Sequence, residues 1–425
     1  MKFIVEKSKL SGSVSIPGSK SHTIRAVAFA ALADGVSIIT EPLESDDTQS
    51  AVKAYSALGA SFNESPEGWK IQGNKGIIKN IKTEIDTGNS GTTIRIATGS
   101  AALASDSDIV LTGDEQIQMR PIKQLTDALN HLGATAECLR GNGCPPLRIT
   151  APIKGGKTPL RAPSSQFLTS LLINAPLASG DSEIEILELN EKPYVDMTFW
   201  WLDKLGIRCE HDGYDRYFLP GGQKISAFSC RIPGDFSSAT FFAAAAAATG
   251  STLLLKGLDM TDTQGDKAVL GILREMGAGV DVTADGIIVS GGGLRGGEFD
   301  LNATPDALPA LAVAACAADG ETRFVNVPQA RIKETDRIAV ICRELSKMGA
   351  DVEALPDGLI VRGSPLKGAK VDGHKDHRVV MALAVAGLFA SGVTEIDTAE
   401  SAAVTFPNFS DLMVSCGAAL KTIRE

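Results

Sequence analysis

Leu58-Gly59-Ala60 is the first of six short segments in which a helix-like run meets a glycine followed by a small or apolar residue. The other five are Leu132-Gly133-Ala134, Leu205-Gly206-Ile207, Met276-Gly277-Ala278, Met348-Gly349-Ala350 and Cys416-Gly417-Ala418. Subtracting the residue numbers of successive glycines gives spacings of 74, 73, 71, 72 and 68 residues. So regular a period indicates six copies of one structural unit. Because equivalent loops of such copies gather in space, the repeat also predicts where function resides.

Each copy contains the same order of elements. A polar loop opens an alanine-rich helix; a β-rich run, an amphipathic helix that ends at the glycine, and a hairpin-like pair of strands follow. The glycine is expected to end its helix in the left-handed conformation. The alanine-rich helices are expected at 20–33, 92–104, 166–178, 237–249, 309–318 and 378–390. The β-rich runs include 36–40, 108–112, 183–187 and 252–255, and a hairpin is expected at 351–354 and 358–362.

The two helices of a copy differ in their expected burial. The run 241–248 contains no polar residue, which predicts a helix buried on all sides. In the fifth copy, apolar residues recur at helical spacing and predict an amphipathic helix. These apolar residues are Ile338, Ile341, Leu345 and Met348, and the residues expected to face solvent are Arg343, Glu344 and Lys347.

The two chain ends are expected to share a domain. The sixth copy lacks its return strand, whereas the β-like segment 2–16 has no copy of its own. Ile-Pro-Gly occurs at 16–18 and again at 232–234, three repeats apart, each time before a polar loop and a helix. The prediction is therefore one domain of three repeats at 19–231, and a second of three repeats formed by 1–18 with 232–425. The hinges are expected near 16–18 and 231–234.

Composition restricts the class of protein. The net charge of −10 over 425 residues argues against a nucleic-acid binder, and the longest apolar run is too short to span a bilayer. The first ten residues, MKFIVEKSKL, do not read as a signal peptide. Seven cysteines without a Cys-x-x-Cys pair indicate reduced thiols. A cytoplasmic protein without nucleic-acid or membrane partners is expected.

Polar loops precede all six alanine-rich helices, at 17–25, 88–95, 163–166, 233–238, 305–306 and 376–378. Free backbone N–H groups and the helix dipole favour anions at helix N-termini. For any single serine or aspartate, a simple N-cap is the alternative. Six equivalent loops, four of which add Lys, Arg, Asn or Gln, together favour an anion-binding site.

A second set of charged residues stands where the amphipathic helices start: Arg120-Pro121, Lys192-Pro193-Tyr194 and the run 333–337. Lys333 and Arg337 are four residues apart, which predicts one helical face, with Glu334 adjacent. A solvated charged turn is the alternative.

Two other motifs do not indicate a binding site. The stretch 12–21 has the wrong glycine spacing for a phosphate-binding P-loop. The set Asp372, His374, Asp376 and His377 lacks a further ligand motif, so no metal is predicted.

Seven segments occur in an informative order: PGSKSHTIRA (17–26), GNSGTTIR (88–95), SSQFLTSLL (164–172), KPYVDMT (192–198), RIKETDR (331–337), DHRVVMA (376–382) and TFPNF (405–409). Over essentially the whole chain they resemble the EPSP synthase (3-phosphoshikimate 1-carboxyvinyltransferase) family. The resemblance implies an α/β fold of two domains, each an inside-out barrel of three βαβαββ units, which agrees with the repeat. It also implies transfer of the enolpyruvyl group of phosphoenolpyruvate to the 5-hydroxyl of shikimate 3-phosphate, with release of phosphate. No cofactor or metal is implied, and a monomer is expected.

The resemblance assigns roles motif by motif. Lys20 is implied to contact both substrates, with Ser21 and Arg25 at the shikimate carboxylate. The 3-phosphate is implied to bind Ser164, Ser165, Gln166, Lys333 and Tyr194. Phosphoenolpyruvate is implied to bind Lys20, Asn89, Gly91, Arg120, Gln166, Arg337 and Arg378, with Arg95 and His377 behind them. Glu334 is implied to donate a proton and Asp306 to accept one while contacting shikimate 3-phosphate, and Lys20 is implied to steady charge.

Three positions depart from the best-known bacterial members of the family. Glu191 replaces a serine, Gln329 an asparagine, and Val404 a lysine. These changes are expected to alter substrate affinity and the response to glyphosate, the family's inhibitor, although Gly91 keeps the small residue of sensitive members.

Two other functions compete with this interpretation. A sister enzyme transfers enolpyruvate to UDP-N-acetylglucosamine, but it carries a reactive cysteine before the Arg-Pro pair, and the loop 113–119 has none. A non-catalytic repeat protein that binds anions is the second alternative. A relative that processes RNA ends is disfavoured by the acidic charge balance.

Overall fold

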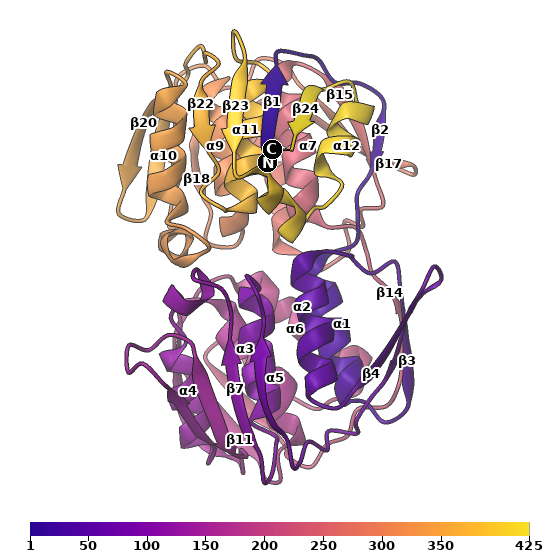
Figure 1. Cartoon of the computed structure of the whole chain (residues 1–425). Coiled ribbons are helices and arrows are strands. Elements are labelled where there is room, and N and C mark those ends of the chain that lie inside the picture. The colour runs from indigo at the N-terminus through magenta and orange to yellow at the C-terminus, as the bar shows by residue number, and fades with distance from the viewer. Residues whose placement is uncertain (425) are drawn as a thin grey trace. The chain divides into compact units, whose positions relative to one another are not determined.

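The computed structural model describes residues 1–424. The chain divides into two compact units (Figure 1). We call Gly18–Ile232 the central unit, and 1–17 together with the residues from Pro233 onward the terminal unit. Within residues 1–424, no helix has both the length and the apolar character needed to cross a membrane.

The central unit contains three sheets and six α-helices. The helices are α1 (Lys20–Leu32), α2 (Asp46–Ala57), α3 (Gly91–Ala101), α4 (Lys123–His131), α5 (Ser165–Asn174) and α6 (Lys192–Lys204), with short 3-10 helices η1 (Ile117–Met119) and η2 (Ala175–Leu177). The strands are β3 (Val36–Thr40), β4 (Ser61–Ser65), β5 (Gly68–Gln72), β6 (Lys82–Asp86), β7 (Asp108–Thr112), β8 (Thr135–Cys138), β9 (Leu147–Ala151), β10 (Gly156–Ala162), β11 (Ser182–Leu189), β12 (Glu210–Asp212), β13 (Arg216–Leu219) and β14 (Ser229–Arg231). The sheet orders are β14-β3-β5-β4, β6-β7-β9-β8 and β10-β11-β13-β12.

The terminal unit repeats this plan. Its helices are α7 (Phe236–Thr249), α8 (Ala268–Glu275), α9 (Leu308–Cys316), α10 (Arg337–Lys347), α11 (His377–Gly387) and α12 (Phe409–Ser415), with η3 (Gly265–Lys267), η4 (Pro305–Ala307), η5 (Pro328–Ile332) and η6 (Ala399–Val404). The strands are β1 (Lys2–Glu6), β2 (Ser13–Ser15), β15 (Thr252–Lys256), β16 (Gly279–Thr283), β17 (Gly286–Ser290), β18 (Glu298–Asp300), β19 (Glu321–Val325), β20 (Asp351–Leu355), β21 (Gly358–Arg362), β22 (Lys370–Asp372), β23 (Thr394–Asp397) and β24 (Ala419–Ile423). The sheet orders are β2-β15-β17-β16, β18-β19-β21-β20 and β22-β23-β1-β24.

All six sheets are mixed in the same way. In the second sheet, β6 and β7 are parallel, whereas β7 and β9, and then β8 and β9, are antiparallel. In the last sheet, β1 takes the place of the return strand, with Phe3 opposite Ile396 of β23 on one side and Thr422 of β24 on the other. Residues from the start of the chain thereby complete the sheet of the sixth repeat.

The alanine-rich helices form the interior of each unit. In the central unit α3 contacts both α1 and α5, and every residue of α3 is buried. In the terminal unit α7, α9 and α11 contact one another, and α7 is buried from Phe236 to Ala247. Helices on the inside and sheets on the outside are the inside-out arrangement, so the predicted fold is confirmed (Figure 1).

The glycines that define the repeat have the predicted backbone conformation. At positions 59, 133, 206, 277, 349 and 417, φ lies between 67° and 107°, in the left-handed region. A side chain would meet no atom within 4 Å at Gly59, Gly206 or Gly349. At these three positions the requirement for glycine is therefore conformational rather than steric.

The helices differ from the sequence-based expectations in several details. Three of the alanine-rich helices end two or three residues earlier than expected, at Ala101, Cys316 and Gly387. The third alanine-rich helix, expected to run to residue 178, ends as α5 at Asn174 and continues as the 3-10 helix η2, because Pro176 lacks the amide hydrogen that an α-helix requires. Glu344, expected to face solvent, is fully buried. Its carboxylate accepts hydrogen bonds from Lys347 and from the amide of Asp372, and it contacts His374 at 2.9 Å, because the loop before α11 packs over it.

Candidate active site

Three predicted binding residues of the central unit meet where α3 and α5 begin. Gln166 donates to Thr92 Oγ1 at 3.0 Å and accepts from Arg95 Nη1, which joins the two helix starts. Arg120 lies against Gly91: a Cβ at position 91 would be 2.7 Å from Cζ of the guanidinium. The structure thus gathers Gly91, Arg120 and Gln166 around two helix N-termini, where anions are favoured.

The loop that leads into α3 is held by acidic and amide side chains. Asn89 donates from Nδ2 to Asp114 Oδ2 at 2.6 Å and to Gln116. Ser90 caps the helix by accepting from the amide of Thr93. These contacts fix the backbone that Asn89 and Gly91 belong to.

Lys20, at the start of α1, forms a buried ion pair. Its Nζ lies 3.0 Å from Oδ2 of Asp47 on α2, and the two side chains are 12% and 5% exposed. The backbone carbonyl of Asp47 also accepts from Thr93 on α3. Lys20 is thereby connected to the same helix start as Gly91, and an anionic ligand has to compete with a carboxylate for it.

Arg25 ties α1 to two other helices. Its guanidinium donates to the side chains of Thr198 and Thr169 and to the carbonyl oxygens of Ser21 and Tyr194, at 2.9 to 3.2 Å. Burial lowers the pKa of Arg25 to about 10, which leaves it charged at neutral pH. The predicted contact of Arg25 and Ser21 with a substrate carboxylate stays a prediction.

Ser164 and Ser165, expected to receive a phosphate, surround the carboxylate of Glu191. Oε2 of Glu191 accepts from Ser164 Oγ at 3.2 Å, from Ser165 Oγ at 2.9 Å and from the Ser165 amide at 3.1 Å. All three residues are buried. We call these three donors the serine cradle.

In the terminal unit, one carboxylate collects the predicted cations. Asp306 Oδ1 accepts from Arg337 Nη1 at 2.8 Å and lies 3.8 Å from Lys333 Nζ, while Oδ2 is 2.9 Å from Arg378 Nη2. The four side chains are between 1% and 17% exposed. Asp306 is partly buried, and three positive charges within 4 Å of it favour a negatively charged group at this position.

Arg337 is the most connected member of this cluster. It donates from Nη2 to Glu334 and makes two further hydrogen bonds, of 2.9 and 3.1 Å, to Asp376. Burial alone would lower the pKa of Arg337, but Asp376, Glu334 and Asp306 raise it above its ordinary value. Asp376 was not predicted as a site residue; its place directly before His377 and Arg378 was the available signal.

The prediction that Lys333 and Arg337 share one helical face is wrong. α10 begins at Arg337, whereas Lys333 follows the 3-10 helix η5 in an extended conformation. Pro328 opens that 3-10 helix, and Asp336 caps α10 by accepting from the amide of Ala339. Both cations nevertheless reach Asp306.

The start of α7 differs from the cationic loops. Asp235 caps this helix, and Ser237 and Thr304 both donate to Asp266. Gln329 donates to the carbonyl of Asn302 at 3.0 Å. The carboxylates of Asp235 and Asp266 therefore both lie at this helix start, and the expectation of an anion site at all six loops stays a prediction.

The loop 372–377, which carries two histidines, packs within the terminal unit. His374 Nε2 lies 2.9 Å from Glu344, whereas His377 is buried at the first turn of α11. Across the described residues 1–424, no three His, Cys, Asp or Glu side chains are grouped as metal ligands.

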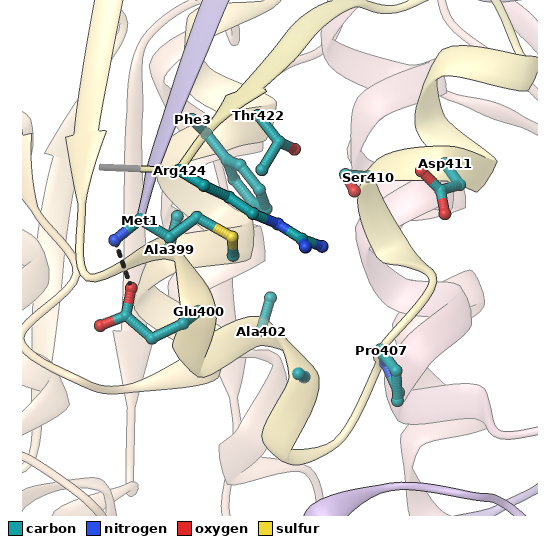
Figure 2. A pocket seen from close by; sticks show the side chains of 11 residues that line it. Met1, Phe3, Ala399, Glu400, Ala402, Pro407, Ser410, Asp411, Thr422 and Arg424 are labelled. Carbon is teal, nitrogen blue, oxygen red and sulfur yellow. Dashed lines mark ion pairs between the residues drawn. The ribbon is translucent and has the colours of Figure 1, made fainter.

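A cavity of about 640 Å³ lies elsewhere in the terminal unit (Figure 2). Phe3, Pro407 and Arg424 line it, and Met1 contributes an amino group 3.0 Å from Glu400. It contains none of the predicted site residues.

Comparison with known proteins identifies the family. The profile of the family described as EPSP synthase (3-phosphoshikimate 1-carboxyvinyltransferase) matches residues 4–413. The chain belongs to the EPSP synthase family. A 3-phosphoshikimate 1-carboxyvinyltransferase of Acetivibrio thermocellus is 53% identical over 418 residues, covering 98% of this chain and 99% of that protein. One of Ruminiclostridium cellulolyticum is 52% identical, covering 99% of both chains.

The solved structures agree with this assignment. An EPSP synthase from Acinetobacter baumannii superimposes with a TM-score of 0.83 at 29% identity and full coverage of both chains. Family and fold, as predicted from the motifs, are therefore confirmed. The roles that the EPSP synthase motifs imply for individual residues remain predictions, which the two clusters above make specific.

Proposed function

We propose that this protein transfers the enolpyruvyl group of phosphoenolpyruvate to the 5-hydroxyl of shikimate 3-phosphate and releases phosphate. Membership of the EPSP synthase family over nearly the whole chain is the observation that carries the proposal. The two clusters of buried charge support it, because both substrates are small polyanions.

Binding residues are proposed in each unit by itself. In the central unit, Arg120, Gln166 and Lys20 supply donors for phosphoenolpyruvate, and the serine cradle supplies donors for the 3-phosphate. In the terminal unit, Arg337, Arg378 and Lys333 supply fixed cations. Arg and Lys recognise phosphate and carboxylate oxygens through charge-assisted hydrogen bonds, which are stronger than neutral ones.

The chemistry needs one proton donor and one proton acceptor. The donor protonates the methylene carbon of phosphoenolpyruvate while the 5-hydroxyl attacks the neighbouring carbon and gives its proton to the acceptor. The bond from that carbon to the phosphate oxygen then breaks, phosphate leaves, and a methyl proton returns to the group that donated the first one. Glu334 is proposed as the donor. Asp306 is proposed as the acceptor, since its three cationic neighbours favour the carboxylate form.

Preorganised charge is proposed to stabilise the tetrahedral intermediate. Asp376 holds the Arg337 guanidinium from its Nε side, and Asp306 fixes Nη1. Cations fixed in this way need little reorganisation when charge develops, which is the main requirement for electrostatic catalysis.

The cysteines near the loop 113–119 argue against UDP-N-acetylglucosamine as the acceptor. The loop 113–119 has no cysteine, but the structure brings Cys144 close to it, with Sγ 3.4 Å from the carbonyl of Met119. Burial raises the pKa of Cys144 above its ordinary value, partly offset by Arg95. A thiol with a raised pKa is a poor nucleophile.

The deciding experiment measures phosphate release from phosphoenolpyruvate with shikimate 3-phosphate, with UDP-N-acetylglucosamine, and with no acceptor. Release that depends on shikimate 3-phosphate is expected. Release with the nucleotide sugar alone would indicate the sister activity. A folded protein that releases no phosphate with either acceptor would leave only an anion-binding role.

A monomeric state, a cytoplasmic location and hinges at 16–18 and 231–234 belong to the same proposal. The seven free cysteines are compatible with a reducing compartment.

A further inference from the structure

The serine cradle contains an anion that the protein itself supplies. A single oxygen of Glu191 accepts all three hydrogen bonds, from two hydroxyls and one backbone amide. Ser164 is the N-cap of α5 and Ser165 its first residue, so the carboxylate also lies at the positive end of a helix dipole. Ser164, Ser165 and Glu191 are 5%, 1% and 2% exposed, which leaves little solvent to share these donors.

The same donors are the ones proposed to bind the 3-phosphate of the acceptor. A phosphate oxygen needs the hydroxyl and amide hydrogens that Oε2 of Glu191 now accepts. Two anions that share one set of donors repel each other, so both cannot occupy the cradle in ionised form. The phosphate carries more charge and more acceptor oxygens than a carboxylate, so it is the stronger ligand for such donors.

The backbone at Glu191 suggests that this arrangement is held by the side chain. Its φ of 59° and ψ of 41° are left-handed, a conformation that glutamate seldom adopts. Glu191 is the N-cap of α6 but makes no capping hydrogen bond with its side chain. The hydrogen bonds of the cradle are the visible compensation for this strain.

The connection that carries Glu191 is short and lies near solvent. Only Asn190 and Glu191 separate the end of β11 from the start of α6, and the next residue, Lys192, is exposed. Glu191 thus belongs to a two-residue connection rather than to a helix or strand, directly before an exposed residue.

We propose that Glu191 is an internal substitute for the phosphate of the acceptor, and that the incoming phosphate displaces its carboxylate from the serine cradle. Glu191 then determines how tightly the acceptor binds. The identity of the phosphate as that of shikimate 3-phosphate rests on the proposed function, whereas the displacement itself does not.

The test compares the full-length protein with Glu191→Ser and Glu191→Gln. Binding of inorganic phosphate and of shikimate 3-phosphate is measured by calorimetry, and KM is measured for both substrates. Both variants are expected to bind shikimate 3-phosphate at least tenfold more tightly, about 1.4 kcal/mol, and inorganic phosphate more tightly as well. The KM for phosphoenolpyruvate is expected to stay within about twofold of the original value, because only the cradle changes.

Glu188→Gln is the matched control. It removes the same charge from a 46% exposed side chain on β11, three residues away, and is expected to leave both affinities unchanged. Glu191→Gln keeps the length of the side chain, so it decides the question if Glu191→Ser does not fold.

Unchanged or weaker binding of both ligands in the Glu191 variants would overturn the proposal and make Glu191 a structural part of the site. The two proposals fail separately. A protein that turns over no shikimate 3-phosphate refutes the proposed function, while tighter binding of inorganic phosphate in Glu191→Ser and Glu191→Gln still supports displacement.

Discussion

The guanidinium of Arg120 packs directly on the Cα of Gly91, so closely that a Cβ there would lie 2.7 Å from Cζ and 3.0 Å from Nη2. Gly91→Ala therefore has to push Arg120 away from the start of α3. Loss of one charged hydrogen-bond donor costs about 1.5–3 kcal/mol, so the KM for phosphoenolpyruvate is expected to rise about 10- to 100-fold. Steady-state kinetics at saturating shikimate 3-phosphate measures this change.

Gly271→Ala is the control for that substitution. Gly271 lies within α8, and an added Cβ would meet no atom within 4 Å. Alanine in a helix is favoured over glycine, so this variant is expected to keep its kinetics and gain about 0.5–1 kcal/mol of stability. An unchanged KM in Gly91→Ala would show that Arg120 does not contact phosphoenolpyruvate, or that it adapts without loss.

Substitution of either proposed proton-transfer residue is expected to lower kcat. Asp306→Asn and Glu334→Gln keep the size of each side chain but remove its ability to exchange a proton. Each is expected to lower kcat by about 10²- to 10⁴-fold. Rapid-quench measurement of phosphate release checks this, and circular dichroism checks the fold.

Asp336→Asn provides the comparison for these losses. Asp336 is also acidic and lies between Glu334 and Arg337 in sequence, but it caps α10 and pairs with Arg331. Its substitution is expected to affect stability more than kcat. Equal kcat values in Asp306→Asn and the unmodified protein would exclude Asp306 as the acceptor.

The hydrogen bonds between Arg337 and Asp376 indicate that Asp376 holds the guanidinium in position. Asp376→Asn weakens two charged hydrogen bonds and leaves the buried guanidinium less well fixed. The KM for phosphoenolpyruvate is expected to rise about tenfold, with a loss of stability of about 2 kcal/mol. Thr335→Val removes only a neutral donor to Asp376 and is expected to have a much smaller effect on KM. If Asp376→Asn and Thr335→Val raise the KM for phosphoenolpyruvate and lower the stability by the same amounts, the role of Asp376 is purely structural.

The fold could be predicted from the repeat because each copy is marked by a glycine that the backbone conformation requires. The glycines after the amphipathic helices are required by φ, and their spacing needs no knowledge of tertiary contacts. The strands at 36–40 and 108–112 have the predicted bounds for a similar reason, since alternation of buried residues is local.

The site could be predicted only in part, because its pairings are not local. Lys20 and Arg337 are recognisable as cations in specific motifs, but their partners Asp47 and Asp376 are 27 and 39 residues away, by subtraction. The occupation of the serine cradle by Glu191 depends on the approach of two elements, and sequence indicated only an unusual residue there. Helical periodicity likewise placed Glu344 on the polar face without indicating that the loop 372–375 covers that face.

Glu344 gives a prediction for the dependence of stability on pH. Burial would raise its pKa, but hydrogen bonds from Lys347, His374, the Asp372 amide and Arg343 outweigh burial and lower it to about 2, from an ordinary value of 4.5. A folded-state pKa below the unfolded one stabilises the fold above the unfolded pKa, and the contribution disappears as pH falls toward the folded pKa. Glu344→Gln is therefore expected to cost about 2 kcal/mol at pH 7 and progressively less between pH 4.5 and 2. Thermal unfolding midpoints at pH 7, 5, 4 and 3 measure the difference, with Glu275→Gln on the exposed end of α8 as a control that shows no such trend. A difference that is constant from pH 7 to 3 would mean that shape rather than charge holds Glu344 in place.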